Sequence, residues 1–259
     1  MTINTKTREK RKKGKAKEEL RSMSLLEHIE ELRKRLNYII SGVVVAFFLC
    51  VNWADKIFAF LSVPVEKALH GKSKLVFTKL QGPFVLYMKV ALLAGFLLAL
   101  PWIFYHLWKF IAPALYRKEK TQVFPFLFFT SVSFIAGTAF GYYVMFPLAF
   151  EFLIEMGKDF TPMLTIDDYF GLVFRMLLAL GCIFELPVII YFLAKLGLIT
   201  HRFLIKSLRW AIIIIFIIGA ILSPPDVFSQ ILVSIPLLIL YLLGILIAWA
   251  VTKRKEKKD

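Results

Sequence analysis

Residues 169 to 194 read YFGLVFRMLLALGCIFELPVIIYFLA, and only Arg175 and Glu185 among them are charged. A helix rises 1.5 Å per residue, so about 26 residues make a helix of about 39 Å, which exceeds the hydrocarbon core of a bilayer at about 30 Å. The stretch therefore predicts a membrane-spanning helix, with Pro187 late in it.

The composition of the whole chain agrees with such a span. Of the 259 residues, 59% are hydrophobic, and the mean hydropathy is +0.71. The chain also has 33 Lys and Arg against 18 Asp and Glu, for a net charge of +15. Charges scattered through the apolar stretches would keep them out of lipid, so the basic residues must lie between those stretches. The composition excludes a water-soluble globule and predicts a polytopic membrane protein with basic loops.

The apolar segments predict an all-α protein with six membrane spans, at about residues 36–53, 83–105, 123–146, 169–194, 210–222 and 227–251. Apolar residues that recur every three or four positions from Ser24 onwards predict an amphipathic, interfacial helix that leads into the first span. Pro101 interrupts the second span, and Pro64 lies in the polar stretch that precedes it.

The spans form one membrane domain, residues 23–251, between two charged tails. Residues 1–22 are rich in Lys and Arg and predict a disordered basic tail, which anionic lipids would attract. Residues 252–259 predict a basic cytoplasmic tail.

Charge decides whether the short fifth segment crosses the membrane. With six spans and the N-terminus inside, the inner segments hold 25 of the 33 basic residues and the outer segments hold 6. Without a fifth crossing, the basic C-terminal tail would face outward, against the positive-inside bias. The charges thus favour six spans with both termini cytoplasmic, the fifth being short.

Motifs for covalent chemistry are missing from the sequence. It has no phosphate-binding loop, zinc-protease helix or serine-hydrolase elbow, and the four histidines fall outside the predicted spans. Cys50 and Cys182 lie in apolar runs, where a buried thiol is more plausible than a disulfide. We therefore expect no enzyme activity, metal site, cofactor or nucleic-acid partner.

Glu185 stands out because it is flanked by apolar residues inside a span. An ionised side chain there costs about 2.5 to 3.5 kcal/mol on insertion scales, so it needs a partner, a proton or water. It either contacts a substrate or partner helix in a cavity, or it fixes helix packing. Arg175 lies about 15 Å away along the helix, too far for a direct pair. Lys89 and Arg175 are expected to extend to the interface.

Two further carboxylates lie in basic cytoplasmic surroundings. Glu31 precedes Arg33, Lys34 and Arg35, and Glu119 follows Arg117 and Lys118. Chemistry alone favours a modest role, in which Glu31 pairs with Arg35 and Glu119 neutralises its neighbours.

The segment SPPDVFSQ at residues 223–230 separates the last two spans. Asp226 is expected to cap the last helix after the double proline, which is a structural role. Gln230, one turn later, is expected to bond a neighbouring helix within the membrane.

Five segments together resemble the TatC family, the multispanning receptor subunit of the twin-arginine protein translocase. They are HIEELRKRL at residues 28–36, FIAPALYRKE at 110–119, FPLAF at 146–150, FELP at 184–187 and SPPDVFSQ at 223–230. Their order and spacing match the family from residue 24 to about 250. The resemblance implies six helices in a curved, glove-like arrangement.

The resemblance also implies a function. Such receptors bind the paired arginines of signal peptides on folded precursors, and carboxylates suit planar guanidinium groups. The implied signal-binding residues are Glu31, Arg33, Phe110 and Glu119, whereas Pro64, Pro101 and Asp226 are implied to be structural. Glu185 matches the family's glutamate in the membrane cavity, and Ser223 with Gln230 resembles the docking site for partner helices.

The implied partners are TatA-like and TatB-like single-span subunits, twin-arginine signal peptides and membrane lipids, in an oligomeric complex. The implied location is the cytoplasmic (inner) membrane of a bacterium or archaeon, where the proton-motive force drives export. Two other hypotheses remain. A small secondary transporter would use Glu185 as a proton relay, and an inert scaffold would use neither Glu185 nor Glu119.

Overall fold

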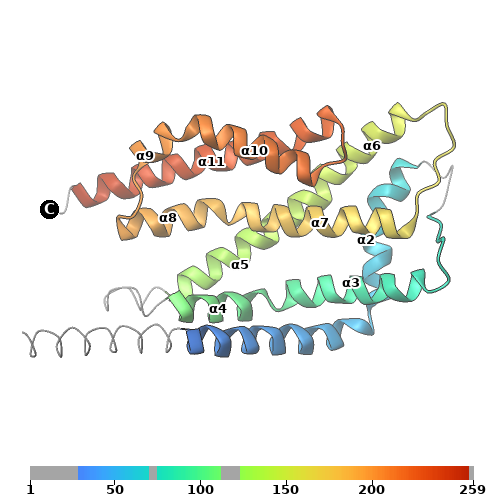
Figure 1. Ribbon diagram of the computed structural model, residues 1–259, viewed down its shortest axis with the longest axis horizontal. Helices are drawn as coiled ribbons and strands as arrows, with labels where there is room; N and C mark the ends of the chain where they lie inside the picture. The colour runs from blue at the N-terminus through green and yellow to red at the C-terminus, as the bar shows by residue number, and fades with distance from the viewer. Residues whose placement is uncertain (1–28, 70–74, 112–122, 257–259) are drawn as a thin grey trace, which may run out of the picture.

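The computed structural model describes residues 29–69, 75–111 and 123–256, and almost all of this part of the chain is helical (Figure 1). The N-terminal helix is followed by α2 and by nine further α-helices, with a π-helical turn, η3, between α5 and α6. Their bounds are Ile29–Val51 for the N-terminal helix, α2 Ala54–Ala68, α3 Gly82–Leu98, α4 Leu100–Ile111, α5 Val123–Phe140, η3 Gly141–Met145, α6 Phe146–Met156, α7 Ile166–Phe184, α8 Leu186–Leu196, α9 His201–Lys206, α10 Leu208–Leu222 and α11 Val227–Glu256.

Most of the long helices run side by side, and α2 and α5 cross the others (Figure 1). The start of the N-terminal helix and the ends of α4, α8 and α11 gather at one end of the bundle, which we call the Glu31 end. The α2 helix lies toward the opposite end, which we call the α2 end. The predicted tail at residues 1–22 lies outside the described residues.

Four helical stretches are long and apolar enough to cross a membrane: Ile29–Val51, Pro125–Met156, Ile166–Leu196 and Val227–Lys253. The α3 and α4 helices make a fifth if they count as one span, bent by 55°. The described residues thus form an all-helical membrane protein with four to five candidate spans. The predicted fifth span is the helix α10, whose 15 residues extend only about 22 Å and do not qualify by length.

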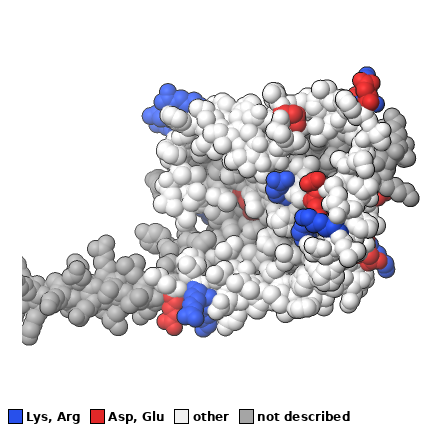
Figure 2. Space-filling model, turned by 45° about the vertical axis from the view of Figure 1, so that its right-hand side comes forward, with Lys and Arg blue, Asp and Glu red and all other residues white. Residues whose placement is uncertain are grey.

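The outer surface agrees with a membrane setting. Many large apolar side chains are exposed, among them Phe48 at 67% and Ile221 at 70%. Charged side chains form only small groups on the face in Figure 2, with wide uncharged areas between them.

Prolines account for the breaks in two of the spans. A helical proline lacks an N–H donor and crowds the carbonyl four residues earlier. Pro101 follows the bend between α3 and α4, and Pro187 follows the break at Glu185 between α7 and α8. At the second break, Ser133 Oγ of α5 donates a hydrogen bond of 2.6 Å to the carbonyl of Phe184.

The helix of the predicted third span continues beyond the predicted bounds. The span was predicted at about residues 123–146, and the helical path extends through α6 to Met156. The turn before Pro147 is the π-helix η3, and Pro147 occupies the first turn of α6, where a proline is tolerated. The widened turn removes the clash that would otherwise end the helix.

The core forms where α5 and η3 pack against α7. A Cβ atom on Gly137 would lie 2.5 Å from the carbonyl oxygen of Leu180, and one on Gly141 would lie 2.9 Å from the Leu180 side chain. Small residues at such crossings let two backbones approach closely. The central residues Phe146, Phe170 and Val173 have exposed fractions of 1% or less.

Side-chain bonds fix the α2 end of the bundle. Tyr142 and Tyr169 donate hydroxyl hydrogen bonds to the carbonyls of Phe60 and Leu61 in α2. Lys89 Nζ of α3 lies 3.1 Å from Asp167 Oδ1 of α7. Lys89 therefore forms an interhelical pair, which the sequence did not predict.

Candidate functional site

Glu31 is a partly exposed acid on the first described turns of the N-terminal helix. Its Oε1 accepts a hydrogen bond of 3.0 Å from Arg35 Nη2, one turn later on the same helix. This is the local pair expected from the spacing. Such exposed i,i+4 pairs stabilise by only about 0.3 to 0.5 kcal/mol, so another guanidinium can displace Arg35. Arg33 is exposed on the same helix.

The N-terminal helix is the least buried of the four long stretches, so a few contacts set its position. The indole Nε1 of Trp102 in α4 donates a hydrogen bond of 2.8 Å to the carbonyl of Tyr38. A Cβ on Gly42 would overlap the Trp102 ring, so the ring needs the glycine at that position. The contact holds α4 against the helix that carries Glu31.

His106 completes this contact. Its ring stacks on Tyr38 at 5.2 Å and meets Trp102 at 4.6 Å, and its exposed fraction is 4%. Neither ring nitrogen has a hydrogen-bond partner within the described part of the chain. We call Tyr38, Gly42, Trp102 and His106 the aromatic clamp. The sequence did not predict it, although the closely spaced aromatic residues and His106 in α4 were a visible signal.

Phe110 lies one turn after His106, near the end of α4, and is partly buried. The clamp thus joins the two elements that carry Glu31 and Phe110, and both lie at the Glu31 end. Lys109 Nζ lies 4.6 Å from the centre of the Tyr105 ring. Glu119, the other acid expected in the site, lies outside the described residues.

Glu185 occupies the single residue between α7 and α8 and is 6% exposed. Its Oε1 has no hydrogen-bond partner in the parts of the chain that are described. An unpaired buried carboxylate oxygen is costly to retain for packing alone. Glu185 lies between α7 and α8 and not on the two helices that carry Glu31 and Phe110, so we treat it as a second candidate site.

The turn before α11 holds a group of polar side chains. Asp226 Oδ1 accepts a hydrogen bond of 2.6 Å from the Ser229 backbone N–H, the helix-capping geometry expected from the sequence. Gln230 Nε2 donates to the Phe216 carbonyl at 3.0 Å, so Gln230 does bond a neighbouring helix, the chain's own α10. Ser223 is buried, and its hydroxyl has no partner among the described residues.

The two remaining structural residues lie inside helices. Pro64 is buried within α2, and Pro101 is exposed in the first turn of α4.

Within the described ranges, no group of three His, Cys, Asp or Glu side chains could hold a metal ion.

Comparison with known proteins identifies the family. The family model for TatC, "Sec-independent protein translocase protein", matches residues 27–236. The chain is 38% identical to the TatC protein of Koribacter versatilis over 247 residues, which are 94% of this chain and 91% of that protein. It is 41% identical to the Campylobacter jejuni TatC protein over 235 residues, 90% of this chain and 96% of the relative.

A solved structure, described as the twin-arginine translocase receptor TatC, superimposes with a TM-score of 0.79 at 36% identity. The match covers 87% of this chain and 99% of that one. These similarities indicate a multi-pass membrane protein of twin-arginine protein translocation, a transport component and not an enzyme. The chain belongs to the TatC family of Sec-independent protein translocase proteins.

Proposed function

We propose that this chain is the receptor that binds the paired arginines of twin-arginine signal peptides through Glu31 and Glu119, with Arg33 and Phe110 beside them. The contact between Arg35 and Glu31, 3.0 Å long, carries the proposal, because it is a guanidinium already bound to the Glu31 carboxylate. Glu31 is partly exposed, so an arginine of a signal peptide can replace Arg35 there.

The proposed topology has six spans in a curved arrangement with both termini in the cytoplasm, and one membrane domain over residues 23–251. The distribution of 25 basic residues on one side against 6 on the other supports it. In this topology α10 is the short fifth span and the Glu31 end faces the cytoplasm. The membrane is the inner membrane of a bacterium, and the relatives named above are bacterial.

We propose that single-span TatA-like and TatB-like partners dock on the α10–α11 hairpin, in an oligomeric complex that the proton-motive force drives. The buried Ser223 hydroxyl supports this site. It has no hydrogen-bond partner among the described residues, so it can form a hydrogen bond with a side chain of a partner helix. Gln230 contributes through its carbonyl oxygen, since its amide nitrogen already bonds α10. Glu185 serves as a membrane-embedded polar contact for the signal or a partner.

Photo-crosslinking of a twin-arginine signal peptide to membranes with Glu31→Gln tests the receptor proposal. Compared with the unaltered chain, Glu31→Gln is expected to lose crosslinks to the signal peptide. The loss should be at least as large as the one seen when the two arginines of the signal are replaced by lysines and the unaltered chain is used. Glu30→Gln is the matched control, because Glu30 is an exposed acid on the same helix. Unchanged crosslinking in Glu31→Gln, or an equal loss in both variants, would contradict the site.

The alternative of a secondary transporter rests on Glu185 as a proton relay. It predicts gradient-driven solute uptake by the purified chain alone in liposomes, which the receptor proposal does not. Family membership favours the receptor.

A further inference from the structure

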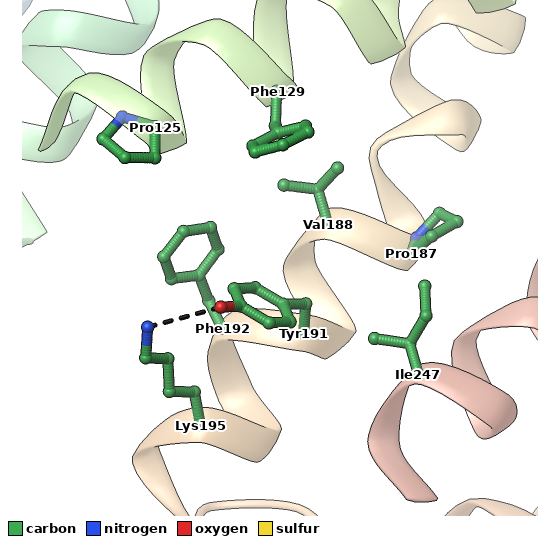
Figure 3. A pocket seen from close by; sticks show the side chains of 8 residues that line it. All are labelled: Pro125, Phe129, Pro187, Val188, Tyr191, Phe192, Lys195 and Ile247. Carbon is green, nitrogen blue, oxygen red and sulfur yellow. Dashed lines mark hydrogen bonds between the residues drawn. The ribbon is translucent and has the colours of Figure 1, made fainter. Parts of the chain in front are cut away.

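A pocket of about 560 Å³ opens between α5, α8 and α11 (Figure 3), and the end of α8 lies at the Glu31 end of the bundle (Figure 1). It belongs to none of the sites described above. Its lining residues are Pro125, Phe129, Pro187, Val188, Tyr191, Phe192, Lys195 and Ile247. Six of these eight side chains are wholly apolar, so the pocket takes a hydrocarbon-like group.

The two polar side chains of the pocket lie together at one end of it. Lys195 Nζ donates a hydrogen bond of 3.3 Å to Tyr191 Oη and lies 5.3 Å from the centre of that ring (Figure 3). Lys195 is in the last turn of α8, which ends at Gly197 with a φ of 80°. Pro187 is in the first turn of α8, about 12 Å farther along the axis. The pocket is therefore basic near the helix end and apolar deeper in the span.

This division matches the two parts of a phospholipid. An ammonium beside a tyrosine hydroxyl binds phosphate oxygens, and an apolar trough holds an acyl chain. A wholly apolar partner helix, in contrast, offers no group that could bind the Lys195 ammonium. The basic arm of a signal peptide would be repelled by the same lysine. The charge thus selects among the possible occupants.

We propose that the pocket lined by Val188, Tyr191 and Lys195 is a binding site for one anionic phospholipid, whose phosphate contacts Lys195 and whose acyl chain lies between Phe129 and Ile247. The site rests only on the geometry of α5, α8 and α11, so it stands or falls independently of signal binding.

Native mass spectrometry of the full chain in detergent, titrated with phosphatidylglycerol or with phosphatidylcholine, tests the site. One phosphatidylglycerol is expected to bind more tightly than phosphatidylcholine. Lys195→Gln is expected to weaken phosphatidylglycerol binding about fivefold, the effect of one lysine near an anionic lipid surface. Lys206→Gln, an exposed lysine of α9, is the matched control and should bind as the unaltered chain does.

Val188→Trp fills the trough and should reduce binding of both lipids while Lys195 remains. Equal binding of the two lipids, or the same loss in Lys195→Gln and Lys206→Gln, overturns the proposal. A photo-reactive residue at position 247 identifies the occupant in membranes. Crosslinks to phospholipid support the site, and crosslinks that go mainly to a polypeptide overturn it in favour of a docked helix.

Discussion

The side chain of Trp102 is bound to the backbone of Tyr38: the indole Nε1 donates a hydrogen bond of 2.8 Å to the Tyr38 carbonyl. This bond joins α4 to the N-terminal helix two turns from Glu31. The neighbouring Gly42 gives the indole its room, because a Cβ there would overlap the ring. The position of the proposed signal-binding acid therefore depends on a glycine and a tryptophan that do not themselves bind the signal.

Gly42→Ala is expected to displace Trp102 and break its bond to Tyr38. Overpacking of this kind destabilises by about 1 to 3 kcal/mol, so thermal unfolding in detergent should shift downward and signal-peptide binding should weaken. Gly171→Ala is the control, because a Cβ at Gly171 meets nothing within 4 Å. That variant should be neutral or slightly stabilised, since alanine favours a helix by about 1 kcal/mol over glycine. Equal behaviour of the two variants would show that the aromatic clamp does not position the helix.

Arg35→Gln is expected to make Glu31 more available to a signal peptide. The internal pair is worth about 0.3 to 0.5 kcal/mol, so affinity should rise about twofold. Peptide titration against the purified chain measures this, with Lys34→Gln as a control that removes the same charge without the pair. A drop in affinity for Arg35→Gln alone would mean that Arg35 orients Glu31 and does not compete for it.

Glu185→Leu is expected to reduce protein export without reducing the stability of the chain. Replacing a buried carboxylate whose Oε1 has no partner among the described residues with an apolar side chain of similar size should leave the free energy of unfolding unchanged or raise it. Export of a folded twin-arginine precursor should nevertheless fall, if Glu185 contacts the signal or a partner. Cys182→Ala, an exposed change one turn away, should affect neither measurement. A stable and fully active Glu185→Leu protein would assign Glu185 to packing.

The pair of Lys89 and Asp167 should couple α3 to α7 only weakly. Both side chains are partly exposed, so a double-mutant cycle with Lys89→Met and Asp167→Asn is expected to give about 0.2 to 1 kcal/mol. The coupling should shrink as salt rises, because exposed charges are screened. The pair of Lys158 and Glu155, at 3.5 Å and with both side chains mostly exposed, should give less. A coupling that does not change with salt would show that the pair is shielded from water.

The helical membrane architecture was predictable because it depends on long apolar runs and on proline. The run that contains Glu185 predicted its span and the presence of a proline late in it, and the helix breaks just before that proline. The continuation of the third helix through Pro147 to Met156 was not predicted, because it depends on the π-helical turn before that proline, for which the sequence carries no marker. The pairing of Lys89 with Asp167 was not predictable either, because the two residues are 78 positions apart and meet only through tertiary packing.

In the candidate site, too, some contacts follow from local sequence spacing and others depend on tertiary packing. The pair of Glu31 and Arg35 follows from helical spacing, and the cap at Asp226 follows from the preceding prolines. The contact of Gly42 with Trp102 depends on how two separate helices cross, which local pattern does not determine. Glu31 and Phe110 came from the family resemblance, whereas the aromatic clamp between their helices became visible only in three dimensions.

The aromatic clamp fixes the N-terminal helix at Tyr38, so the helix can tilt about this point. Glu31 lies seven residues before Tyr38, about 10 Å along the axis, and a tilt of about 10° at the clamp therefore moves the Glu31 carboxylate by about 2 Å. A shift of that size is enough to make or break a hydrogen bond to a guanidinium. Any force on α4 near Trp102 would thus be transmitted to the arm that holds Glu31.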